Sequence, residues 1–173
     1  EIVHLNEKLL TELGGSWLAP TKNTLGVQAL CGGEYYKLAE KAIAHQFGSK
    51  PWFFKDPRIC LLLPFWRHFF SVSPIVIVVV RSFNDVARSL HERDGIPIEY
   101  GERLAGTYLN ALSRGCRGLP SIVVEYERVL SSPEAAVKIL GKFLEDHGVG
   151  PLVEKKKAIE VLAPQENHHG QKC

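Results

Sequence analysis

Basic residues end two of the most apolar stretches of this 173-residue chain, at positions where they could bind an anion. Arg81 follows 75–80, a run of six consecutive β-branched apolar residues. Such a run predicts a strand buried on both faces, as inside a parallel sheet. Lys55 ends the aromatic segment 51–55, which predicts a second buried strand.

A third strand is predicted over 122–126 and ends in Tyr126. Because the carboxyl ends of parallel strands meet at one edge of a sheet, we expect Lys55, Arg81 and Tyr126 along one rim. Two cations and an aromatic ring suit a nucleotide that carries additional phosphate or sulfate charge. The alternative is that Lys55 and Arg81 only end their strands in solvent, and the residue pattern leaves both open.

The residues after Arg81 predict a helix that begins at the same edge. Ser82 with Asp85 three residues later resembles a capping box, and Val86, Ala87 and Leu90 supply an apolar side. A helix N-terminus in this position favours anions, and ligands of open α/β sheets bind where strands end and helices begin.

Helices are predicted between and around the strands, so the chain is expected to be of the α/β class, with a parallel sheet flanked by helices. We expect a single domain over 1–163 and a polar tail over 164–173. Pro64 is expected to kink or end the helix in which it lies. The predicted helices cover 1–13, 34–47, 58–70, 82–93, 98–114, 130–148 and 152–162.

The composition of the chain excludes only a few classes of function. The net charge of +2 gives no reason to expect nucleic acid as a partner, and no apolar run approaches membrane-spanning length. The four cysteines have neither metal-ligand nor disulfide-framework spacing, so we expect no metal and reduced thiols in a cytoplasmic protein. The chain contains no methionine and begins at Glu1, so it is not expected to be a complete primary translation product.

The segment RSFNDVARSL closely resembles the 3′-phosphate-binding segment of the sulfotransferases. In that family an Arg at a strand end and a Ser eight residues later hold the 3′-phosphate of the sulfate donor PAPS (3′-phosphoadenosine 5′-phosphosulfate). The resemblance implies these roles for Arg81 and Ser89. The chemistry is coherent, because an Arg donates a charge-assisted fork to phosphate oxygens and a Ser adds a neutral donor.

Other segments resemble sulfotransferases in the same order along nearly the whole chain. They are IVHLNEKLLTELGGSW, WFFKDPRICLLLPFW, RSLHERDGIP and VVEYERVLSSPEAAVKILGKFL. The resemblance implies a P-loop NTPase-like sulfotransferase fold of bacterial type, and it implies that Tyr126 lies near the adenine.

The chain departs from the family in one segment. No sequence resembling the family's 5′-phosphosulfate loop is present, since GGSWLAPTK does not follow a buried strand. We therefore expect the chain to start after that loop and the sheet to lack its first strand. A noncatalytic relative, which binds a nucleotide or a protein partner through an exposed sheet edge, remains the alternative to an enzyme.

The resemblance implies in-line transfer of a sulfuryl group from PAPS to a hydroxyl or amine of a small-molecule or carbohydrate acceptor. Lys55 is the candidate to stabilise charge on the oxygen that bridges to the leaving phosphate. Asp56 is the candidate base, and the alternative is a turn carboxylate before Pro57. Arg58 is expected either to contact donor or acceptor or simply to begin a helix.

Overall fold

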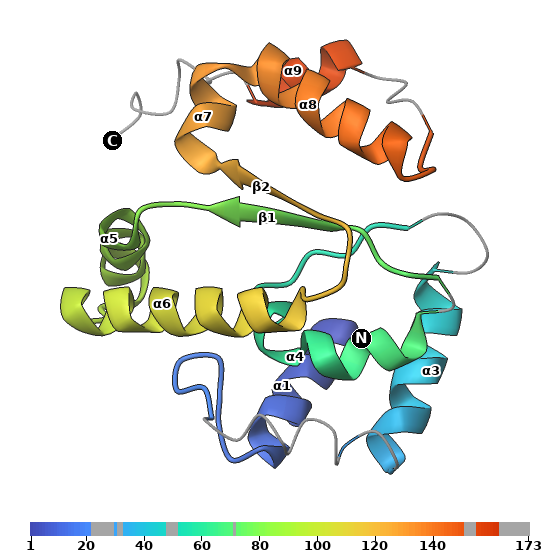
Figure 1. Ribbon diagram of the computed structural model, residues 1–173. Coiled ribbons are helices and arrows are strands. Elements are labelled where there is room, and N and C mark those ends of the chain that lie inside the picture. Colours follow the sequence, from blue (N-terminus) through green and yellow to red (C-terminus); the bar gives the residue numbers. More distant parts are fainter. Residues whose placement is uncertain (22–29, 31–32, 48–51, 71, 151–154, 163–173) are drawn as a thin grey trace, which may run out of the picture. The chain divides into compact units, whose positions relative to one another are not determined.

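The computed structural model describes residues 1–21, 30, 33–47, 52–70, 72–150 and 155–162. The chain divides into two compact units (Figure 1). The first comprises Glu1–Pro74 and Ser82–Pro120, and the second comprises Ile75–Arg81 and Ser121–Cys173. No helix in these ranges is long and apolar enough to cross a membrane.

The regular elements of the first unit are all helices among its described residues, and irregular segments connect them. Its core is built where α1, α3 and α4 meet, and the largest fully buried side chains there include Trp66 and Phe65. In α1 the apolar residues Ile2, Leu5 and Leu9 recur at the spacing of one helix face, which explains why that face is buried. The elements are α1 (Ile2–Glu12), α3 (Glu34–Phe47), α4 (Ile59–Trp66), η2 (Arg67–Phe69), α5 (Phe83–Asp94) and α6 (Ile98–Gly115).

Helix α4 carries Pro64 inside it and passes into the 3₁₀ turn η2 three residues later. The helix packs against the end of α6, where a Cβ added to Gly115 would lie 3.3 Å from Leu63. Arg67 donates from Nη1 to the carbonyls of Gly115 and Arg117, both at 3.1 Å. The end of α6 is therefore held against α4 by close packing and by satisfied carbonyls.

Helices α5 and α6 form a hairpin whose ends follow the sequence signals. Ser82 caps α5 by accepting a hydrogen bond from the amide of Asp85 at 3.1 Å, as predicted. Gly95 ends α5 with φ +71°, a left-handed conformation that favours glycine. Where the two helices are closest, a Cβ on Gly101 would lie 2.9 Å from Ala87, so only glycine fits.

The second unit contains the parallel sheet of β1 (Val76–Val80) and β2 (Ser121–Glu125). The register pairs Val76 with Ser121 and Val80 with Glu125. α7 directly follows β2 and packs against α8, which packs against α9 (Figure 1). These helices are α7 (Tyr126–Ser131), α8 (Pro133–Asp146) and α9 (Lys155–Leu162), and Pro133 is the first residue of α8.

The mixed α/β class with a parallel sheet is confirmed, but three details of the strand predictions are wrong. The strand β1 is not buried on both faces, because Val79 is 61% exposed and Val123 of the neighbouring strand is 64% exposed. The faces of a parallel sheet are buried by helices packed on them, and among the described residues no element covers the sheet at Val79 or at Val123.

The second wrong detail is the strand predicted over 51–55. Residues 52–55 have no regular structure. Phe54 packs edge-on against Trp66 of α4, with ring centroids 5.9 Å apart, and Phe53 is 79% exposed. Phe54 thus covers a helix, and the segment does not pair in a sheet. Tyr126, predicted as the last strand residue, is the first residue of α7.

Candidate functional site

Two groups of predicted site residues are ordered around arginines, one in each unit. In the second unit Arg81 directly follows β1, and Tyr126 directly follows β2. Because the strands are parallel and Val80 pairs with Glu125, the two residues emerge side by side at the same sheet edge. The guanidinium carbon of Arg81 lies 4.8 Å from the centre of the Tyr126 ring, a cation–π arrangement.

Glu127 is the third member of this second-unit group, and the sequence analysis did not identify it. Its Oε1 accepts a hydrogen bond from Nε of Arg81 at 3.2 Å, and both side chains are exposed. Within the described residues, the terminal nitrogens Nη1 and Nη2 of Arg81 make no other hydrogen bond or ion pair. The guanidinium of Arg81 contacts Glu127 through Nε and Tyr126 through one face, so it still presents two donor nitrogens to an anion.

The other residue assigned to the 3′-phosphate, Ser89, lies on α5 in the first unit. Its side chain is exposed. Lys55 is also exposed and belongs to the first unit, in the irregular segment that precedes α4. Each residue is therefore accessible to a ligand.

Asp56 and Arg58 lie inside a closed network of polar contacts in the first unit. Oδ1 of Asp56 accepts from the backbone amide of Arg58 at 2.9 Å and from its Nη1 at 3.1 Å. Oδ2 accepts from Nδ2 of Asn6 at 2.9 Å. The Asp56 side chain is only 1% exposed. These are the contacts of a turn carboxylate, the alternative that the sequence left open.

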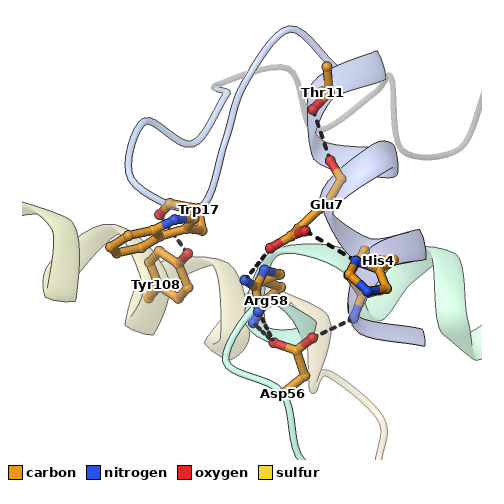
Figure 2. Close-up of polar contacts among 8 residues, drawn as sticks. His4, Glu7, Thr11, Trp17, Asp56, Arg58 and Tyr108 are labelled. Carbon is orange, nitrogen blue, oxygen red and sulfur yellow. Dashed lines mark hydrogen bonds and ion pairs between the residues drawn. The ribbon is translucent and has the colours of Figure 1, made fainter. Parts of the chain in front are cut away.

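Arg58 bridges the turn to α1. Figure 2 shows Glu7 and Asp56 on two sides of its guanidinium. Nη2 donates to Oε1 of Glu7 at 2.7 Å. Burial lowers the pKa of Arg58, but the hydrogen bond and charge of Asp56, followed by the charge of Glu7, outweigh it and raise the pKa. Both terminal nitrogens of Arg58 hydrogen-bond within the protein. Its guanidinium therefore offers no free pair of nitrogens to a ligand.

Neither Asn6 nor Glu7 was predicted as part of this network, and Asn6 is the buried one of the two. It is fully buried, and its Oδ1 accepts from Nε1 of Trp66 at 2.8 Å. A signal existed, because Asn6 lies four residues from both Ile2 and Leu10 on the apolar face of α1. A polar residue on a buried stripe predicts a buried hydrogen-bond partner.

The surroundings of this network are poorly hydrated. Burial raises the pKa of the Cys60 thiol to about 11. Burial also raises the pKa of Tyr108, whose hydroxyl donates to the carbonyl of Trp17 at 2.7 Å (Figure 2). Both groups are therefore neutral at pH 7, and neither is an activated nucleophile.

No group of three or more metal-ligating residues occurs among the residues that the structure describes. The polar tail predicted over 164–173 lies outside them. A surface hollow of about 310 Å³ between α3 and η2 contains none of the predicted site residues. It is lined by Tyr36, Glu40, Ile43, Ala44, His68 and Phe69.

Comparison with protein-family models, curated proteins and solved structures found no match to this chain. The sulfotransferase resemblance therefore stays a prediction drawn from the residues.

Proposed function

We propose that the chain belongs to a PAPS-dependent sulfotransferase, in which Arg81 binds the 3′-phosphate of the donor and Tyr126 lies near the adenine. The observation that carries the proposal is the pairing of Arg81 and Tyr126 at the carboxyl edge of two parallel strands, 4.8 Å from guanidinium carbon to ring centre. A cation beside an aromatic ring suits the phosphate and the base of one nucleotide.

In the proposed reaction an acceptor hydroxyl or amine attacks the sulfur of PAPS. A bond forms from the acceptor to sulfur, the bond from sulfur to the bridging oxygen breaks so that PAP leaves with that oxygen, and the proton of the acceptor passes to solvent. Lys55 is the candidate to stabilise the charge that develops on the bridging oxygen, and its exposure supports this. Ser89 would add a hydroxyl donor to the 3′-phosphate.

The proposal is tested by calorimetric titration with PAP, the desulfated product of the donor. We expect binding, and we expect Arg81→Ala to weaken it by roughly one to three orders of magnitude, because a charged contact is lost. Arg114→Ala is a matched control, since Arg114 is exposed on α6 and the variant loses the same charge. Failure of the unaltered chain to bind millimolar PAP would overturn the proposal.

A second candidate function is noncatalytic binding of a nucleotide or a protein partner. The exposure of Val79 and Val123 in the β1–β2 sheet favours it, because parallel sheets are usually covered on both faces. The two functions differ in turnover. An enzyme releases PAP from PAPS in the presence of an acceptor, whereas a binding protein retains intact PAPS.

A further inference from the structure

The buried hydrogen bonds around Asp56 have a fixed direction. The indole Nε1–H of Trp66 can only donate, so the atom of Asn6 that faces it must be the oxygen Oδ1. The amide nitrogen Nδ2 of Asn6 is consequently directed at Oδ2 of Asp56. Trp66 thus fixes the orientation of the Asn6 side chain. Because Nδ2 of Asn6 donates toward residue 56, that residue must present a hydrogen-bond acceptor.

Asp56 also organises the backbone that follows it. Its side-chain Oδ1 accepts from the amide of Arg58 at 2.9 Å, and its carbonyl accepts from the amide of Ile59 at 3.0 Å. These two bonds form the turn that leads into α4. Lys55 is the residue immediately before this turn, so the position of its backbone depends on the carboxylate of Asp56.

We infer that Asn6 and Asp56 are positioning residues and that Asp56 is not the proton acceptor. The hydrogen bonds of the two residues hold the turn that follows Lys55 against α1 and α4. A base must reach the proton that it removes, but the Asp56 side chain is 1% exposed and both of its oxygens already accept hydrogen bonds. Only the consequence for catalysis, a correctly placed Lys55, rests on the proposed function.

The two residues can be exchanged in a way that preserves every side-chain hydrogen bond. In the double variant Asn6→Asp with Asp56→Asn, the new carboxylate accepts from Trp66 and from the new amide. The amide oxygen at position 56 still accepts from Arg58. Each single variant fails in this respect, because Asn6→Asp sets two buried carboxylates against each other and Asp56→Asn sets two amide nitrogens against each other.

The deciding measurement is hydrogen exchange of the backbone amides over residues 56–61 in the full chain. We expect each single variant to exchange at least about tenfold faster there, because buried polar groups lose their partners and the turn opens locally. The double variant is expected to return to within about threefold of the unaltered chain, since coupled residues are not additive. Asn110→Asp, on the exposed side of α6, is the matched control and should change nothing in this segment.

Unchanged exchange in Asp56→Asn would overturn the inference, as would a folded double variant that exchanges as fast as the single variants. If the single variants do not fold, a folded double variant supports the inference and an unfolded one overturns it. Hydrogen exchange requires no ligand. A chain that fails to bind PAP therefore overturns the proposed function but leaves this test intact.

Discussion

The two arginine-centred groups of this protein use the same chemistry for different ends. Arg58 contacts two carboxylates, and the Asp56 side chain beneath it is excluded from water. Arg81 contacts one carboxylate and one ring, and both partners are exposed. In the first group both oxygens of Asp56 and both terminal nitrogens of Arg58 are paired inside the protein, so this group holds the fold. The second group leaves the two terminal nitrogens of Arg81 as donors for a ligand, so it is the group suited to binding.

The largest effect is expected on the stability of the fold when Asp56, which pairs with Asn6 and Arg58, is replaced. Asp56→Ala removes the acceptor of Asn6 and of Arg58 and should lower the free energy of unfolding by about 3 kcal/mol, because buried partners are left uncompensated. Arg81→Ala should cost less than about 1 kcal/mol, since exposed pairs contribute little.

Urea unfolding followed by circular dichroism measures both variants. Tryptophan fluorescence isolates the first unit, because Trp17, Trp52 and Trp66 all lie in it. Equal losses of stability in Asp56→Ala and Arg81→Ala would contradict the distinction between a structural group around Arg58 and a binding group around Arg81.

A smaller effect concerns pH and the poorly hydrated surroundings of the Asp56 group. Burial raises the pKa of Cys60 from 9.0 to about 11 in the folded chain. Its neutral thiol therefore contributes stability below pH 9, and this contribution is lost as the pH rises from 9 to 11. The loss should reach about 2 kcal/mol near pH 11, at roughly 1.4 kcal/mol for each unit of pKa difference.

Cys60→Ala removes this titration and should flatten the dependence of stability on pH over the same interval. Urea midpoints between pH 8 and pH 11 measure it. The control is Cys116→Ala, because burial raises the pKa of that thiol as well but Arg67 opposes the rise. Identical pH profiles for the unaltered chain and Cys60→Ala would show that Cys60 is hydrated.

The smallest effect is expected at Glu127 and distinguishes two roles for its ion pair with Arg81. Glu127→Gln keeps an oxygen that can accept from Nε but removes the negative charge that competes with a bound anion. PAP should therefore bind about two- to fivefold more tightly, as expected for an exposed charge pair. Titration calorimetry measures it, with Glu134→Gln on α8 as the control. Weaker binding would instead identify Glu127 as the residue that orients Arg81.

Local sequence signals predicted the ends of several elements because the interactions that end a helix lie within a few residues. Ser82 meets the amide of Asp85 three residues away, and the helices predicted over 82–93 and 98–114 end within one residue of α5 and α6. The parallel pairing of β1 with β2 and the meeting of Arg81 with Tyr126 followed from alternating strands and helices. The sulfotransferase roles of these residues remain predictions.

The sequence by itself determined where the strongest helices lie, that the strands are parallel, and which basic residue ends β1. Only the tertiary structure decided the chemistry at Asp56, because its partner Asn6 is 50 residues distant and is reached only when α1 packs against the turn before α4. The structure also decided that Phe54 covers a helix and that residues 52–55 form no strand, since aromatic side chains suit either surface. Burial and distant partners are properties of the packed chain, and no local pattern contains them.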